Sequence, residues 1–242
     1  MKQLAVTLFA ILFLSAVAPF AVQAAEKPVG RFSLGYYESS GNTDESKINM
    51  DLRLSQKISD RQKMEYRATY RKNKADEVVT ADKHSFSILN EFVRTERESY
   101  YLTGGYLNDE FAGYDRQYTV GGGVMRYCIK STEQNLRVSA GFDWIKEEYT
   151  DNTDDTNAWL RLGLDADKKL NDRIKSFVDF KLLAQPDELE DSYRAETGVG
   201  LSFDLAENFD AEIKYELNYK KQPAAGAKKN DSSVMVSLVY KI

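Results

Sequence analysis

Apolar and polar residues alternate along most of the chain with a period of two. Residues 47–55 read KINMDLRLS and residues 209–220 read FDAEIKYELNYK, so every second side chain is apolar in both segments. Successive side chains of a β-strand point to opposite faces, whereas residues two apart in a helix lie on nearly opposite sides. The pattern therefore predicts strands that have one apolar face and one polar face.

About twelve such strands follow one another. Most have at least ten residues, which exceeds the usual length of about five or six and matches the roughly nine to eleven that a tilted strand needs to cross a bilayer. The predicted strands are 30–38, 46–57, 62–72, 83–94, 99–109, 116–129, 135–149, 156–169, 173–184, 192–205, 209–220 and 232–242.

The connections alternate between short and long. The short ones are 59–61, 95–98, 130–134, 170–172 and 206–208, and the long polar ones are 39–45, 72–82, 109–116, 150–155, 185–191 and 221–231. Short turns at one rim and long loops at the other are typical of outer-membrane barrels. We predict an all-β fold, a transmembrane antiparallel up-and-down β-barrel of about 12 strands, with Gly41-Asn42 at the tip of the first external loop.

Two orientations of the apolar face fit this pattern. A soluble barrel of lipocalin type would bury it inside, and a membrane barrel would turn it toward lipid. Strand length, the segregation of turns and loops, and charges of both signs on the polar face favour lipid. Tyrosines near predicted strand ends (Tyr70, Tyr100, Tyr101, Tyr149, Tyr193, Tyr219) fit interfacial girdles. The predicted lumen-lining residues are Lys63, Glu65, Arg67, Arg71, Asp143, Arg161, Asp165, Lys181, Arg194, Glu196, Glu212, Lys214 and Glu216.

The N-terminus has the features of a secretory signal peptide. Lys2 precedes an apolar run over 4–17, and Val22-Gln23-Ala24 fits a cleavage site of small residues. We predict a signal peptide at 1–24, removed after Ala24, and an outer-membrane barrel domain at 25–242; the alternative is an N-terminal membrane anchor. The predicted location is the outer membrane of a Gram-negative bacterium, with outer-membrane lipid and lipopolysaccharide as partners.

Composition excludes several other classes of function. The formal net charge of −5 argues against nucleic acid as a partner. One cysteine and one histidine allow no internal disulfide and make a His/Cys metal site improbable. The acidic stretch 151–156 lacks the glycine and the distant glutamate of an EF-hand loop, so a solvated loop is preferred. We predict no cofactor and no metal.

His84 and Cys128 are the two candidate catalytic side chains. Asp82-Lys83-His84 has a spacing similar to that of omptin proteases, and an outer-membrane hydrolase with a site near His84 is one alternative function. His84 shares its parity with Phe86 and Ile88, however, which predicts a position on the lipid face. Cys128 is better explained as a small buried or lipid-facing residue. We predict that the protein is not an enzyme; the second alternative is a soluble periplasmic binding barrel.

Glycines cluster at 104–105 and 121–123, inside predicted strands. A phosphate-binding loop would need a helix after them. A bulge, a sharp coil or close packing of lumen contents is the better interpretation.

Three segments resemble domain-of-unknown-function family 481, the salt-induced outer-membrane proteins. They are the first hairpin with Ser40, Gly41, Asn42 and Thr43, the glycine-rich strand RQYTVGGGVMRY at 116–127, and the last strand ending in Tyr240-Lys241-Ile242. That last strand resembles the signal read by barrel-assembly machinery, with Ile242 in place of the usual terminal Phe or Trp. The resemblance implies an outer-membrane β-barrel and brings no catalytic residue, cofactor or substrate. The predicted function is an outer-membrane protein of unknown substrate, either a narrow pore or an envelope protein of salt stress.

Overall fold

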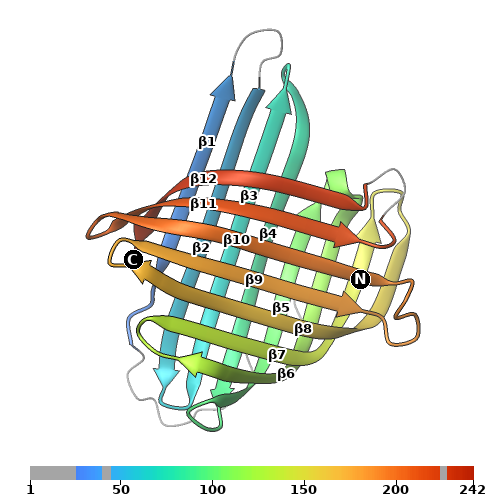
Figure 1. The fold of residues 1–242 in the computed structure, drawn as a ribbon. Coiled ribbons are helices and arrows are strands. Elements are labelled where there is room, and N and C mark those ends of the chain that lie inside the picture. The colour runs from blue at the N-terminus through green and yellow to red at the C-terminus, as the bar shows by residue number, and fades with distance from the viewer. Residues whose placement is uncertain (1–25, 40–44, 224–227) are drawn as a thin grey trace.

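Twelve antiparallel strands close into a barrel in which each strand pairs with its neighbours in sequence and β1 pairs with β12 (Figure 1). The computed structural model describes residues 26–39, 45–223 and 228–242. The strands are β1 (Val29–Ser39), β2 (Glu45–Ser59), β3 (Gln62–Ala75), β4 (Val78–Val93), β5 (Glu98–Asp109), β6 (Tyr114–Lys130), β7 (Gln134–Tyr149), β8 (Asp154–Asn171), β9 (Ile174–Ala184), β10 (Tyr193–Ala206), β11 (Phe209–Lys220) and β12 (Asn230–Lys241). A single 3₁₀ turn, η1 (Glu110–Ala112), follows β5.

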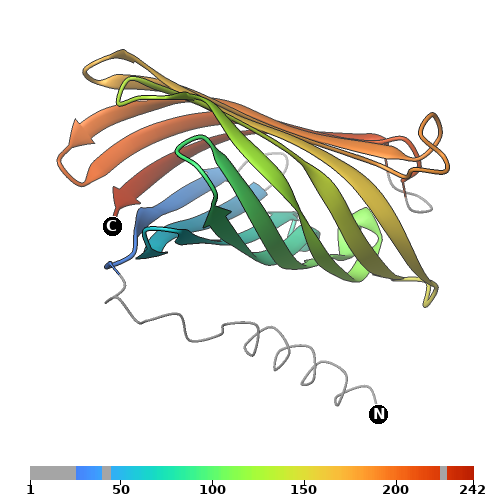
Figure 2. The same ribbon diagram turned by 90° about the horizontal axis from the view of Figure 1, so that it is seen from below.

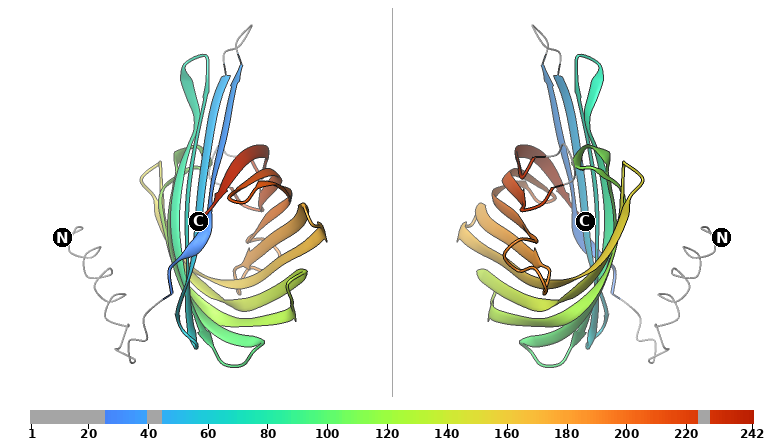
Figure 3. Two further views of the ribbon diagram at one scale, coloured as in Figure 1. Left: turned by 90° about the vertical axis from the view of Figure 1, so that its left-hand side faces the viewer. Right: turned by 90° about the vertical axis from the view of Figure 1, so that its right-hand side faces the viewer.

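The barrel has two walls that face each other. β1–β5 form one wall and β6–β12 the other, and their strands cross in projection because all strands are tilted around the closed sheet (Figures 1 and 2). β1–β4 extend beyond the rest of the barrel at one end (Figures 1 and 3). The predicted twelve-stranded barrel is thus confirmed.

One predicted loop is wrong. Residues 72–82 form strand rather than a long connection, because β3 continues to Ala75 and β4 begins at Val78. Asp76 and Glu77 make the turn alone with φ of 47° and 65°, a tight hairpin conformation that usually calls for Gly or Asn. The strand pairing continues through the predicted loop, and Lys72 Nζ lies 3.4 Å from Asp82 Oδ2 across the hairpin. The residues on both sides of the turn are mostly polar and do not alternate, so the sequence did not show that the two predicted strands extend toward it.

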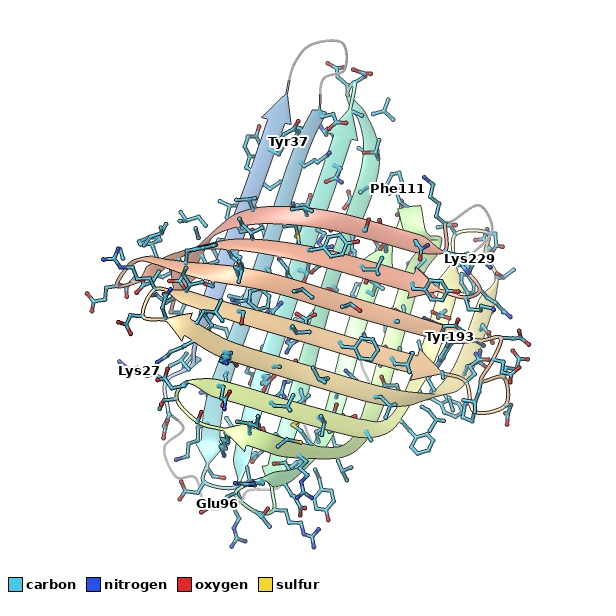
Figure 4. All side chains as sticks on the ribbon, viewed as in Figure 1. Lys27, Tyr37, Glu96, Phe111, Tyr193 and Lys229 are labelled. Atoms are coloured by element: carbon cyan, nitrogen blue, oxygen red, sulfur yellow. The ribbon has the colours of Figure 1, made fainter. Side chains whose placement is uncertain are left out.

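Turns and loops separate to opposite rims. The short-turn rim carries the connections 60–61, 94–97, 131–133, 172–173 and 207–208, together with the start of β1 and the end of β12. Figure 4 shows Glu96 projecting from this rim, and Phe111 and Tyr193 from the opposite one, the long-loop rim. The predicted signal peptide and the loop tip Gly41-Asn42 lie outside the described residues. Within the described ranges, none of the helical segments has the length and apolarity to cross a membrane.

The outer face of the barrel is apolar and exposed. Trp144 is 60% exposed, Phe142 59%, Val234 68% and Val236 65%. A contiguous apolar surface of this kind marks contact with lipid or protein. Aromatic rings gather on it: His84, Tyr106 and Tyr118 have successive ring-centroid distances of 6.0 and 5.5 Å. Tyr101 and Tyr149 are exceptions among the tyrosines predicted near strand ends. Tyr101 is buried inside the barrel, and the Tyr149 hydroxyl reaches the buried carboxylate of Glu147.

Glycines on the inner face make room for larger interior side chains. A Cβ built on Gly141 would lie 2.6 Å from Tyr101 Oη, and one on Gly121 would meet the Asp143 carboxylate. Of the three interpretations of the glycine clusters, close packing of lumen contents is the one that these contacts support.

Candidate functional site

The interior of the barrel, or lumen, is lined by buried charged side chains. Glu91 is 1% exposed, Asp143 2%, Glu147 3% and Glu212 5%. They lie on the face opposite the exposed apolar residues, as alternation along each strand requires. Buried carboxylates are costly unless they are paired, and each of these four has a charged or hydrogen-bonding partner.

Arg137 on β7 joins the two walls of the barrel. One guanidinium nitrogen lies 2.8 Å from Glu65 Oε1 on β3, and another lies 3.0 Å from Asp165 Oδ2 on β8. Three strands separate β7 from β3 around the shorter side of the barrel, so the pair with Glu65 spans the lumen. Arg67 Nη2 lies 3.7 Å from the second oxygen of Glu65, which adds a further cation to this group.

Arg194 on β10 and Glu147 on β7 form the most buried ion pair. Arg194 donates two hydrogen bonds to the Glu147 carboxylate, at 2.7 and 2.9 Å. Gln117 and the Tyr149 hydroxyl also donate to Glu147, at 2.7 and 3.0 Å. The Arg194 guanidinium lies 4.0 Å from the ring centroid of Trp159, so an aromatic face completes its surroundings.

A second group of charges lies between β3 and β11. Arg71 pairs with Glu216, and three strands separate these two residues around the shorter side of the barrel. Lys214 Nζ lies 2.8 Å from Glu216 Oε1 and 3.4 Å from Asp179 Oδ1. Arg31 pairs with Glu212 at 2.7 Å. The pairs of Arg31 and Arg71 therefore connect β1 and β3 of the first wall with β11 of the second.

The remaining predicted residues also have interior partners. Arg161 Nη1 lies 3.1 Å from Asp143 Oδ2, with its guanidinium 5.9 Å from the Tyr101 ring centroid. Lys181 pairs with Glu196 at 2.8 Å, and Lys63 Nζ lies 5.9 Å from the ring centroid of Tyr127. The structure therefore brings every predicted lumen residue into contact with an opposite charge or an aromatic ring.

Sequence reasoning passed over several interior residues. Arg137 and Glu147 share the parity of Asp143 on the same strand, so the alternation on β7 was sufficient to find them. Glu91, Arg31 and Arg53 could have been found in the same way on β4, β1 and β2. Trp159 shares the parity of Arg161 and Asp165 on β8, so alternation would have found it too. Tyr101 was missed because it was assigned to an interfacial girdle by its residue type.

A small polar cavity lies in the lumen between β1–β3 and β11–β12. The space open to the centre of a water molecule is about 30 Å³, enough for about two waters. Its lining is Ser33, Asn49, Met50, Asp51, Arg53, Thr69, Arg71, Glu212, Lys214, Glu216, Met235 and Ser237. Arg71 Nε is buried there without a protein hydrogen-bond partner.

His84 and Cys128 both lie on the outer face and are exposed. In the part of the chain that the structure describes, the His84 side chain makes no hydrogen bond or ion pair, and its ring contact is Tyr106. No group of three His, Cys, Asp or Glu side chains suited to a metal ion occurs among the described residues. The position of His84 on the apolar face matches its parity with Phe86 and Ile88.

The sequence over residues 32–242 matches a family described as "Protein of unknown function, DUF481". The chain belongs to this family. The resemblance seen in the first hairpin, the glycine-rich strand and the last strand is thereby confirmed. Among the curated proteins, none matches this DUF481 chain.

Solved structures share the fold of this DUF481 chain at low sequence identity. An outer-membrane channel from Pseudomonas putida F1 is 8% identical, with a TM-score of 0.55 over 93% of this chain and 100% of the channel. The NanC porin is 9% identical, with a TM-score of 0.53 over 89% of this chain and 100% of the porin. The DUF481 chain is thus a β-barrel of the outer-membrane type, and its fold is that of porins and channels.

Proposed function

We propose that this protein resides in the outer membrane of a Gram-negative bacterium and acts there as a narrow pore, without enzymatic activity. The exposed apolar outer face supports a lipid environment. The likeness of the fold to a porin and an outer-membrane channel supports passage of solutes rather than catalysis. A cleaved signal peptide at 1–24 would carry the chain across the inner membrane.

One observation carries the proposal: ion pairs join opposite walls of the lumen. Arg137 with Glu65 and Arg71 with Glu216 each span three intervening strands. Lys220 on β11 adds a contact to Tyr114 on β6, with its Nζ 4.2 Å from the ring centroid. Side chains that meet across a lumen narrow it to a path for water and small ions. Because the lumen carries acids and bases that pair with one another, we expect low conductance and weak ion selectivity.

The experiment is single-channel recording of refolded residues 25–242 in planar bilayers. We expect small, discrete and reproducible current steps from the natural chain. Arg137→Gln removes a cation that bridges the walls, so it should enlarge the steps and shift selectivity toward cations. Arg116→Gln is the matched control, because Arg116 is exposed and pairs with Asp115 and Glu148 outside the lumen. Silence from both natural and Arg137→Gln chains, shown to be folded and inserted, would refute a pore.

The partners that we propose follow from this location. They are outer-membrane phospholipid, lipopolysaccharide around the exposed apolar face, and the barrel-assembly machinery that inserts the chain. The exposed apolar residues Val234, Val236 and Leu238 of β12 support the last of these. The family resemblance adds a role in salt stress of the envelope to the proposal.

A further inference from the structure

The seam between β1 and β12 is the shortest ladder in the barrel. Among the described residues, Arg31–Leu34 pair with Leu238–Lys241, which makes four residue pairs. Each of the other eleven ladders has between eleven and fifteen pairs. Gly30 and Ile242 add two backbone hydrogen bonds at the short-turn rim, of 3.2 and 2.8 Å. The seam is therefore hydrogen-bonded near the short-turn rim, and the β1–β12 ladder does not continue toward the long-loop rim.

The pairing of β1 with β12 ends at Leu34. A Cβ built on Gly35 would lie 2.8 Å from the Val236 carbonyl oxygen and 3.1 Å from Ser237 Oγ, so the two strands pass closely at Gly35. Past that point they diverge toward the long-loop rim (Figures 1 and 3). Residues 35–39 and 230–237 lie outside the β1–β12 ladder. Strand edges that face hydrocarbon without backbone partners are strongly disfavoured, so the edge of β12 over residues 230–237, which the β1–β12 ladder leaves unpaired, favours a polar environment.

The polar cavity described above lies directly inside this seam. Ser33 from β1 and Met235 and Ser237 from β12 form part of its wall. On the outside, the same two strands expose Leu34 and Val236, which are 41% and 65% exposed. A polar cavity and an apolar surface thus meet where the barrel wall is parted.

We propose that this parted seam is a lateral opening that admits the headgroup of a zwitterionic phospholipid from the bilayer, while its acyl chains remain on the apolar outer face. The cavity lining has three cations and three anions: Arg53, Arg71 and Lys214, and Asp51, Glu212 and Glu216. This balance suits a headgroup that carries one charge of each sign. The buried Nε of Arg71, which has no protein partner, is a donor available to a phosphate oxygen that takes the place of a water in the cavity. The rest of the headgroup, with its ammonium, then lies in the parted seam between the cavity and the bilayer.

Fluorescence quenching tests whether the lumen communicates with the bilayer at the seam. In a Cys128→Ser background, a small fluorophore is attached at Met235→Cys, and the barrel is placed in vesicles containing phosphatidylcholine with a nitroxide on its acyl chain. The matched control carries the fluorophore at Thr103→Cys, which is buried in the lumen on β5, away from the seam. We expect quenching at position 235 to be at least twice that at position 103. Equal quenching at the two positions would contradict the proposal that the seam opens laterally to the bilayer.

Native mass spectrometry tests the headgroup. We expect the natural chain to retain one phosphatidylethanolamine in detergent that strips loosely bound lipid, and Arg71→Gln to lower its occupancy at least fivefold. Lys72→Gln is the control, because Lys72 pairs with Asp82 outside the cavity. Equal retention of phosphatidylglycerol, which carries a net negative charge, would overturn the zwitterionic assignment. Neither readout depends on whether the lumen conducts ions.

Discussion

The ion pair between Arg194 and Glu147 makes the sharpest prediction about stability. Glu147→Gln keeps the shape of the side chain and removes its charge. The pair is bidentate, and only 11% of the Arg194 side chain and 4% of the Glu147 side chain are exposed. The variant therefore leaves a buried guanidinium without its counter-ion.

The size of the effect follows from burial and distance. Two unit charges about 4 Å apart interact by roughly 4 kcal/mol at an effective dielectric constant of about 20. Measured losses from breaking buried pairs are about 3–5 kcal/mol. Glutamine still offers one oxygen to Gln117 or Tyr149, so part of the hydrogen bonding at this position survives. We expect Glu147→Gln to lower the free energy of unfolding by about 3 kcal/mol.

A double-mutant cycle isolates the pair. Arg194→Met removes the cation together with its contact to Trp159, and the double variant removes both charges. Because the double variant has no unpaired charge, we expect it to be less destabilised than the sum of the single variants by about 2 kcal/mol. The assay is urea unfolding of the barrel in lipid vesicles, followed by tryptophan fluorescence.

The control lies on the same strand with the opposite parity. Lys146 pairs with Glu148 at 2.9 Å on the exposed outer side, so Lys146→Gln should cost less than about 1 kcal/mol. A loss of less than about 0.5 kcal/mol for Glu147→Gln, with additive single variants, would mean that water solvates this pair. The reasoning about a narrowed, ion-paired lumen would then be refuted.

Three further predictions concern local geometry. Gly141→Ala should destabilise the barrel by about 1–3 kcal/mol in the same unfolding assay, because the added methyl would meet the Gly122 carbonyl oxygen and lie 2.6 Å from Tyr101 Oη. Gly105→Ala has ordinary contacts of 3.6–3.8 Å and should be tolerated; equal losses for the two variants would contradict this. Glu77→Gly should stabilise the β3–β4 hairpin by about 1 kcal/mol, since Glu77 has a φ of 65°, which glycine adopts without steric cost. Glu77→Ala should not raise the stability, and a rise with alanine would show that backbone strain at position 77 is not the cause. The Thr153 hydroxyl and backbone N–H donate to Asp151 in the exposed loop after β7 and lower the pKa of its carboxyl below 3.8. NMR titration should show that pKa rising toward 3.8 in Thr153→Ala, and an unchanged value would argue against the hydroxyl as its main cause.

Most of the fold could be predicted because one physical rule governs every strand. A strand with lipid on one side and a charged lumen on the other must alternate apolar and polar residues. The extent of that alternation gives the length of the strand, and its phase shows which side chains face lipid. The predicted strand at 209–220 agrees with β11 at both ends for this reason. Both strands of the β3–β4 hairpin were predicted, but their continuation toward the turn was missed, because residues 72–77 are polar apart from Ala75 and carry no alternation.

Sequence alternation assigns residues to the inner face of a strand, but it does not show which of them pair with one another. Parity places Glu65 and Arg137 on the inner face of separate strands, but their meeting depends on tilt, stagger and the shape of the closed barrel. The same limit applies to the β1–β12 seam. Both strands alternate normally in sequence, and only the three-dimensional register shows that they share four residue pairs.

The most direct test of the account is site-directed labelling along β7, which lies away from the β1–β12 seam. Single cysteines at positions 142–145 and 147, in a Cys128→Ser background, carry a fluorophore in vesicles that contain nitroxide-labelled lipid. We predict strong quenching at Phe142 and Trp144, and weak quenching at Asp143, Ile145 and Glu147, in step with the exposed and buried positions of the strand. The opposite phase, with the charged positions quenched, or quenching without alternation, would contradict an apolar face in lipid and an ion-paired lumen.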